Sequence, residues 1–131
     1  MFDFLAIDWG SKRTGLAFGS SLTQLVLPYN KPLLTIEVYS VLEEQIKFKK
    51  IQFLVIGKPT NFQLQNTEVT TQINNFCEEL KIRLPELKQY YVNENNTSKN
   101  NLKTKDPHTI NHNAALEIAR IYLSQNYNIN C

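Results

Sequence analysis

Residues 4–18 read FLAIDWGSKRTGLAF and contain two short apolar runs joined by a polar turn. The first run, residues 2–8, ends on Asp8, and the second covers residues 14–19. The segment between them has the length of a hairpin connection and carries Gly10 near its start, which predicts two antiparallel neighbouring strands. Asp8 is therefore expected at the carboxyl end of a buried strand, directly before a turn.

The rest of the chain alternates between helical and strand patterns. At 36–49 apolar residues, Phe48 among them, recur with a helical period, and the continuous apolar run at 51–57 predicts a central strand buried on both faces. The order βββ-α-β-α-β-α predicts one α/β domain over residues 1–131, with helices packed on a mixed sheet. The further elements expected are a strand at 22–27 ending at Pro28, a helix capped by Thr67 that buries Ile73, Phe76, Cys77 and Leu80, a strand at 88–94, a mobile loop at 95–105 and a last helix capped by Asp106.

The composition excludes some classes of protein. The 131 residues are 42% hydrophobic, and the net charge of +2 with a pI near 8.5 permits nucleic acid as a partner without indicating it. Cys77 and Cys131 are too far apart for a disulfide framework, so two unpaired thiols are expected. No stretch approaches the roughly 18 apolar residues of a membrane span. We expect a soluble cytoplasmic protein without a membrane partner.

Two acidic residues end apolar strands. Asp8 and Glu94 are each expected at the carboxyl end of a strand, the edge at which open α/β sheets bind ligands. If their strands are neighbours, the two carboxylates could share a divalent ion such as Mg²⁺, which accepts one or two carboxylates. The alternative is that Asp8 starts a turn with Gly10 and Glu94 caps a strand in solvent.

The residues after Asp8 could contact a phosphate. Lys12 and Arg13 lie within side-chain reach of a phosphate bound at Asp8, or else they are solvated residues of a hairpin turn. Trp9 either stacks on a base or packs against a neighbouring helix. The cluster Lys47, Lys49 and Lys50 is expected to complement the carboxyl end of its helix rather than to follow a nucleic acid.

These residues resemble the motifs of the YqgF/RuvX proteins of bacteria. Residues 5–19, LAIDWGSKRTGLAFG, are similar to the family's opening motif of strand, Asp, aromatic residue, Gly, small residue, Lys, Arg and Gly. Weaker likenesses follow in the family's order at 53–59 (FLVIGKP), 92–94 (VNE) and 110–116 (INHNAAL). The resemblance implies a ribonuclease H-like fold, a mixed five-stranded sheet with its first three strands antiparallel and helices on its faces.

The resemblance also implies a nuclease. The family is assigned to maturation of pre-16S rRNA, the precursor of small-subunit rRNA, and was earlier proposed to resolve Holliday junctions. By this resemblance Asp8 and Glu94 are catalytic residues that hold two Mg²⁺ or Mn²⁺ ions, with Asp8 bridging them. The family's third acid falls on Asn111, whose amide oxygen can coordinate a metal but brings no charge.

The half of the site around Glu94 departs from the family pattern. Asn93 and Asn95 stand where the family has Asp and Arg, and the span to the last helix is shorter than in the family. Asp106, the remaining acid nearby, either swings toward the site or caps the last helix. His112 either assists at a phosphate or is a solvated residue of the first helical turn.

Two functions therefore stand open. One is a metal-dependent nuclease, with pre-rRNA as the favoured substrate and branched DNA as the alternative. The other is a member of the family that binds RNA or the ribosomal small subunit through Lys12 and Arg13 but cleaves poorly. A sugar-kinase type of phosphotransferase needs a second domain, for which the chain is too short. The protein is expected as a monomer or homodimer.

Overall fold

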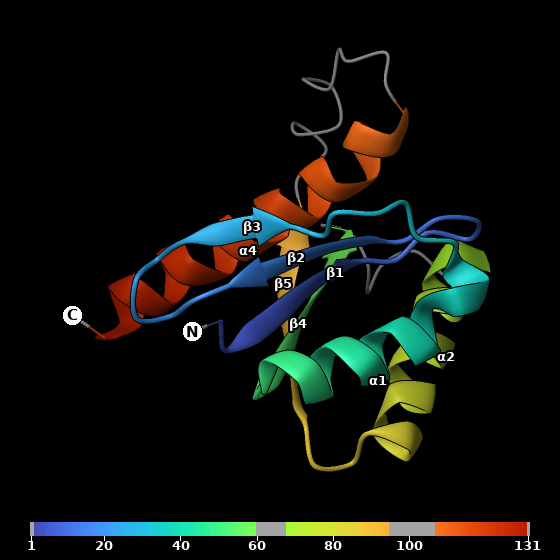
Figure 1. Ribbon diagram of the computed structural model, residues 1–131, viewed down its shortest axis with the longest axis horizontal. Coiled ribbons are helices and arrows are strands. Elements are labelled where there is room, and N and C mark those ends of the chain that lie inside the picture. The colour runs from blue at the N-terminus through green and yellow to red at the C-terminus, as the bar shows by residue number, and fades with distance from the viewer. Residues whose placement is uncertain (1, 60–67, 95–106, 131) are drawn as a thin grey trace.

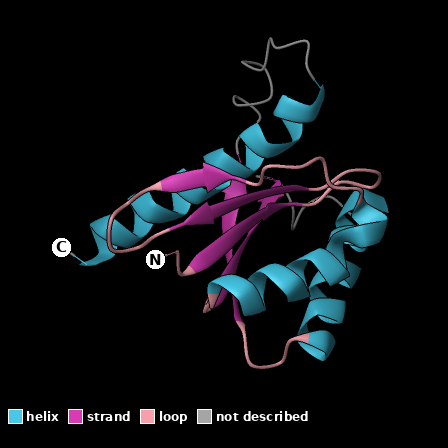
Figure 2. Ribbon diagram, viewed as in Figure 1, coloured by secondary structure: helices cyan, strands magenta, loops and turns pink. Residues whose placement is uncertain are grey.

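The computed structural model describes residues 2–59, 68–94 and 107–130, and of Pro59, Glu94, 107–111 and 126–130 it describes the main chain only. Helix α4 lies on one face of a sheet, and α1 and α2 lie on the other (Figure 1, Figure 2). Within the described ranges, no helix is long and apolar enough to cross a membrane. The elements are β1 (Phe4–Asp8), β2 (Gly15–Gly19), β3 (Val26–Pro28), the 3-10 helix η1 (Thr35–Glu37), α1 (Val38–Lys49), β4 (Phe53–Pro59), α2 (Glu68–Arg83), β5 (Lys88–Glu94) and α4 (Pro107–Asn130).

The five strands form one mixed sheet in the order β3-β2-β1-β4-β5. β1 is antiparallel to β2, and β2 is antiparallel to β3. β1 is parallel to β4, and β4 is parallel to β5. The predicted sheet with its first three strands antiparallel is thereby confirmed. Since β1, β4 and β5 are parallel, their carboxyl ends meet at one edge, which we call the site edge.

Alternation along the strands divides the core between the two faces of the sheet. In β1, Leu5 and Ile7 pack under α1 and α2, whereas Phe4 and Ala6 pack under α4. All four side chains are fully buried. The side chains of β4 also alternate between the two faces of the sheet, which confirms the predicted strand buried on both faces.

The predicted helix at 36–49 is confirmed as η1 followed by α1. One residue of its predicted apolar stripe, Phe48, is not buried. Val38 and Leu42 are buried, and Lys50 ends the helix in the left-handed conformation with φ of 57°. Phe48 is 77% exposed because it lies off the helical stripe that contains Val38 and Leu42. The Lys49 ammonium lies 5.5 Å from the centroid of the Phe48 ring.

The prediction of a strand at 22–27 is wrong in its extent. Ser20 closes a turn by donating its N–H to the Leu25 carbonyl and accepting from the Gln24 N–H, and Leu22 on that turn is 91% exposed. The strand begins only at Val26, and it includes Pro28. Proline is tolerated there because β3 is the edge strand of the sheet.

The remaining elements agree with the sequence. α2 buries Ile73, Phe76, Cys77 and Leu80, and β5 covers residues 88–94. Cys77 is a free thiol, as expected. The predicted cap at Thr67, the loop at 95–105, the cap at Asp106 and the second thiol at Cys131 lie outside the described residues.

Candidate active site

Asp8 is the last residue of β1 and lies at the site edge. It pairs with Gly15 of β2, and the preceding residue, Ile7, pairs with both Leu16 and Ile56, so β1 is held between two strands up to its end. Asp8 follows Ala6 by two positions, and strand alternation therefore directs its side chain to the α4 face. A half-buried carboxylate is thus fixed at the rim of the sheet.

Glu94 ends β5 at the same edge. Its main chain pairs with Pro59 of β4, the strand that separates β5 from β1. Glu94 lies two strands away from Asp8 and two residues further along, so the main chains of Asp8 and Glu94 are about 12 Å apart. Asn111 lies in α4, one turn before the buried Ala115. The roles of Glu94 and Asn111 stay predictions, because their side chains lie outside the described part of the structure.

Helix α4 approaches the sheet closely beside Asp8. Gly57 follows Ile56, the partner of Ile7, and so lies next to Asp8 on the adjacent strand. A Cβ atom at Gly57 would come 2.3 Å from Cδ1 of Ile118, which is fully buried on α4. The glycine therefore permits a contact between helix and strand that any side chain would prevent.

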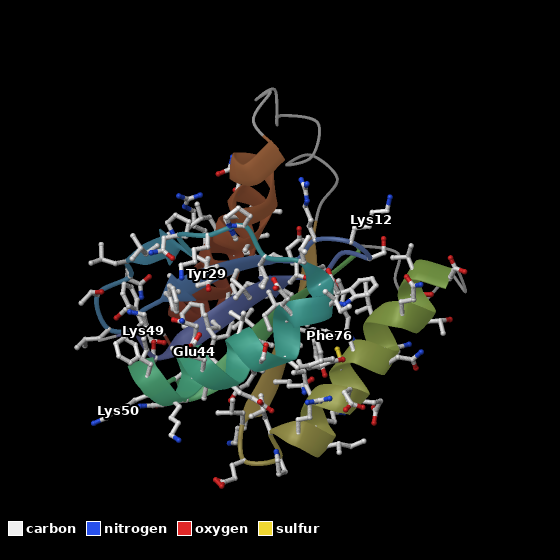
Figure 3. All side chains as sticks on the ribbon, turned by 45° about the vertical axis from the view of Figure 1, so that its right-hand side comes forward. Lys12, Tyr29, Glu44, Lys49, Lys50 and Phe76 are labelled. Atoms are coloured by element: carbon white, nitrogen blue, oxygen red, sulfur yellow. The ribbon has the colours of Figure 1, made fainter. Side chains whose placement is uncertain are left out.

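Lys12 and Arg13 lie on the loop that follows Asp8, and both are exposed. Lys12 extends from this loop near the amino end of α1 (Figure 3). Within the described residues neither side chain makes an ion pair. Two cations are thus available to an anionic ligand a few residues from the carboxylate.

This loop is not a free hairpin, because a third segment is bonded to it. The N–H of Thr14 donates to the Leu33 carbonyl over 3.1 Å, and the N–H of Thr35 donates to the Lys12 carbonyl over 2.9 Å. Arg13 and Leu34 form an antiparallel bridge between these bonds. The main chain that carries the two cations is therefore held by residues 33–35.

A chain of hydroxyl groups adds to the connection between loop and segment. The Thr35 hydroxyl donates to the Gly10 carbonyl over 2.5 Å, so the Thr14 hydroxyl, 2.8 Å from Thr35 Oγ1, must donate to Thr35. Thr14 is fully buried. At Gly10 an added Cβ would lie 2.4 Å from the Arg13 carbonyl oxygen. Gly10 is thus required by the fold of the loop itself.

His112 has a different role from either that the sequence suggests. It is only 7% exposed, and its Nδ1 accepts the N–H of Leu16 over 3.2 Å. An accepting Nδ1 places the proton on Nε2, which donates to the Lys31 carbonyl over 2.7 Å. His112 is therefore neither a solvated residue nor a phosphate ligand, and it bonds α4 to β2 and to the segment after β3.

The reason for this arrangement is the short edge strand. Tyr29 donates its N–H to the Leu16 carbonyl, as in an antiparallel ladder. The Leu16 N–H would return the bond to Tyr29 in a regular pair, but it goes to His112 instead. His112 thus supplies the acceptor where β3 has ended.

Trp9 packs on the opposite face from Asp8. Its ring centroid lies 6.3 Å from that of Phe76 on α2, which confirms the predicted packing against a helix. The Trp9 ring remains half-buried rather than fully enclosed. Lys47 and Lys49 lie in the last turn of α1, as expected for residues that complement a helix end.

Divalent cations fit the chemistry of the site edge only in part. Oxygen donors that Mg²⁺ prefers are available at Asp8 and, by main-chain position, at Glu94. No three His, Cys, Asp or Glu side chains gather as a metal site among the residues that the structure describes. Of the acids proposed for the metal, only Asp8 has its side chain in the described part of the structure.

The sheet order, the antiparallel first three strands and a carboxylate at the end of β1 define a ribonuclease H-like domain. The family model described as RuvX, Holliday junction resolvase, matches residues 3–124. The chain belongs to the RuvX family.

Curated relatives agree with this assignment. A Bacteroides fragilis protein named "Putative pre-16S rRNA nuclease" is 31% identical over 98 residues, which are 75% of this chain and 70% of that protein. Proteins of the same name are 33% identical over 98 residues in Bacteroides thetaiotaomicron, covering 75% and 70% of the two chains. In Christiangramia forsetii the identity is 29% over 99 residues, covering 76% and 73%.

Sequence reasoning missed the residues that hold the loop in place. Thr14 and Thr35 meet across 21 positions of sequence, and His112 meets Leu16 across 96. No periodicity or local motif connects such pairs. The one available signal is that Thr14, a polar residue, interrupts an apolar strand pattern and so has to find a partner.

Proposed function

We propose that the chain is a metal-dependent nuclease that hydrolyses phosphodiester bonds, with pre-16S rRNA as its substrate. The observation that carries this proposal is the joint placement of Asp8, Lys12 and Arg13 on one strand end and its bonded loop. A carboxylate binds a cation, and the two side-chain cations bind the phosphates that flank it. The names of the relatives supply the substrate class.

Asp8 and Glu94 hold the divalent cation in this proposal, as Mg²⁺ or Mn²⁺. When bound, such ions lower the pKa of a coordinated water and stabilise the leaving oxygen. Asn111 offers an amide oxygen where a carboxylate would add charge, so the affinity for a second ion is reduced. Rigid pairing of β1 with its two neighbours keeps Asp8 in place without a second carboxylate to orient it.

Lys12 and Arg13 bind the substrate rather than take part in the chemistry. Arg13 can form two parallel hydrogen bonds to one phosphate, whereas Lys12 acts as a single charge. Because the loop main chain is bonded to residues 33–35, little loop entropy is lost on binding.

A second candidate function is favoured by the residue at position 111. With Asn111 in place of the family's third acid, the chain would bind RNA or the ribosomal small subunit and cleave slowly or not at all. Branched DNA is the alternative substrate, in keeping with the description of the family model.

The test compares the protein with Asp8→Asn on a pre-16S 5′-leader RNA and on a four-way DNA junction, each with Mn²⁺ or EDTA. We expect cleavage of the RNA in Mn²⁺, no cleavage in EDTA and at least about a hundredfold loss in Asp8→Asn. Asp3→Asn is the matched control, since Asp3 lies before the other end of β1 and accepts the Ser21 N–H, which an amide oxygen can also do.

Titration calorimetry with Mn²⁺ gives a readout that does not depend on activity. Mn²⁺ should bind to the protein and to Asp3→Asn but more weakly to Asp8→Asn. Equal cleavage by the protein and Asp8→Asn would exclude Asp8 as a metal ligand. Tight RNA binding without any cleavage would establish the second candidate, and cleavage of the junction alone would establish DNA as the substrate.

A further inference from the structure

A pocket of about 460 Å³ opens between α1 and α2, on the face of the sheet opposite α4. Three aromatic rings line it. The Phe76 centroid lies 6.3 Å from that of Trp9 and 5.7 Å from that of Tyr39. Figure 3 shows Phe76 between the two helices. Since Phe76 is buried and the other two rings are half-buried, the rings offer a partly exposed aromatic wall.

Polar groups converge on the same pocket. Gln72, Asn75 and Glu79 recur at helical spacing along one face of α2, and Ser11 faces them from the loop after β1. Within the described part of the chain, the side chains of Ser11, Gln72 and Asn75 make no hydrogen bond. The pocket therefore holds unused donors and acceptors beside an aromatic wall.

The charges of the pocket do not favour a phosphate. None of its lining residues is a cation, and its one carboxylate, on Glu79, accepts a hydrogen bond from Arg83 over 2.8 Å. Burial, together with the charge of Glu79, raises the pKa of Tyr39, so the Tyr39 hydroxyl stays neutral. One cation borders the pocket: the Arg83 guanidinium lies 4.5 Å from the centroid of the Tyr39 ring, but it is paired with Glu79. Lys12 and Arg13 are not among the lining residues.

The pocket adjoins the candidate active site through the chain itself. Asp8 and Trp9 are consecutive, with Cα atoms about 3.8 Å apart, and they direct their side chains to opposite faces of the sheet. A nucleic acid strand that crosses the site edge with one phosphate at Asp8 would bring the next nucleotide to the mouth of the pocket.

We propose that this pocket binds one unpaired nucleobase of the RNA strand, that of a nucleotide next to the phosphate held by Lys12 and Arg13 beside Asp8. The proposal rests on the nuclease or RNA-binding function proposed above. Sequence-specific recognition of RNA uses stacking of splayed bases on aromatic side chains and hydrogen bonds to their edges. Trp9 supplies the stacking surface, and the amides of Gln72 and Asn75 supply the hydrogen bonds.

This assignment defines the class of substrate. A base inside a duplex is paired and stacked and cannot enter a pocket between two helices. The protein therefore selects RNA that is single-stranded, or has an unpaired nucleotide, at the position next to the bound phosphate.

The experiment uses the full chain in EDTA, so that Lys12 and Arg13 hold the RNA and no bond is cleaved. Trp9 is the one tryptophan of the chain, and its fluorescence reports directly on stacking. A six-nucleotide single-stranded RNA should quench this fluorescence, and the same RNA with abasic positions should not. Fluorescence anisotropy of labelled RNA should show binding about fivefold weaker for Asn75→Ala and at least about fivefold weaker for Trp9→Ala.

Asn74→Ala is the matched control, because Asn74 neighbours Asn75 on α2 and is exposed but does not line the pocket. It should bind RNA within about twofold of the unchanged protein. Trp9→Phe should retain most of the affinity, and circular dichroism checks that each variant is folded.

The outcomes separate this proposal from the function on which it rests. If the protein binds or cleaves RNA but Trp9 is not quenched and Asn75→Ala binds like Asn74→Ala, the pocket is not a base site while the function stands. If the protein neither binds nor cleaves any RNA, both proposals are overturned. Equal binding of intact and abasic RNA also contradicts the pocket.

Discussion

The two faces of the sheet are built in opposite ways near the site edge. On the α4 face, Ile118 contacts the backbone at Gly57 and His112 is bonded to Leu16, which leaves α4 closely seated on the sheet. On the α1 and α2 face, the helices separate beside Trp9 and leave a pocket. Strand alternation places Asp8 on the closed face and Trp9 on the open one.

Because of this difference, the end of β1 can contribute both to metal binding, through Asp8, and to base recognition, through Trp9. A metal-binding carboxylate needs a fixed main chain and a neighbourhood that does not rearrange, which the closed face provides. Recognition of a base needs exposed rings and unused hydrogen-bonding groups, which the open face provides. Substitutions on the closed face should therefore cost stability, whereas those of the pocket amides Gln72 and Asn75, which make no hydrogen bond within the described chain, should cost binding alone.

The largest loss of stability is expected for His112→Ala. It leaves the Leu16 N–H and the Lys31 carbonyl without their partner in a buried position, which should lower the free energy of unfolding by about 3 kcal/mol. Urea denaturation measures this loss, and exchange of the Leu16 amide proton should become faster. Asn113→Ala, one residue further along α4, is the control. A loss below about 1 kcal/mol for His112→Ala would contradict the role assigned to this histidine.

Gly57→Ala tests the close approach of α4 to β4. The new methyl group would collide with Cδ1 of Ile118, and we expect a loss of about 2 kcal/mol in the free energy of unfolding. Ile118→Val removes that Cδ1 and should cost about 1 kcal/mol by itself. In the double variant the two losses should add only in part, because Cδ1 is gone while Cγ1 of residue 118 still lies 2.7 Å from the position of the new methyl group. Additive losses in this cycle would mean that the glycine is needed for another reason.

Thr35→Val removes the hydroxyl that connects the loop to the segment after β3. The Gly10 carbonyl loses its donor and the buried Thr14 hydroxyl loses its acceptor, so a loss of about 1.5 kcal/mol is expected. Because Lys12 and Arg13 lie on this loop, RNA affinity should fall as well. Thr35→Ser keeps the hydroxyl and should restore both measurements. Unchanged stability and affinity in Thr35→Val would show that the main-chain bonds alone hold the loop.

The elements that the sequence predicts well are those with a local pattern. β5 and α1 follow from period and composition, and the end of β1 at Asp8 follows from one apolar run. The extent of β3 was not predictable in this way, because a turn within residues 20–25 competes with the strand. Its short length then creates the need for His112, which no local pattern contains.

The candidate site likewise has one part that a local sequence pattern predicts and one part that it does not. Asp8, Lys12 and Arg13 are consecutive enough for a motif to group them, and the structure places them on one strand end and its loop. The pocket beside Trp9 combines residues from β1's loop, α1 and α2, whose distances in sequence hide their proximity. Of the residues that line the pocket, only Trp9 was considered from the sequence as a contact for a base.

The smallest effect on stability is expected in the pocket itself. Asn75→Ala removes an amide that makes no hydrogen bond within the described chain, and alanine has the higher helix propensity, so the free energy of unfolding should change by less than about 0.5 kcal/mol. Urea denaturation should place Asn75→Ala and Asn74→Ala together, although the two differ in RNA affinity. A residue that contributes to binding but not to folding is what an open recognition face requires. A large loss of stability in Asn75→Ala would instead make the pocket part of the fold, and the contrast between the two faces would disappear.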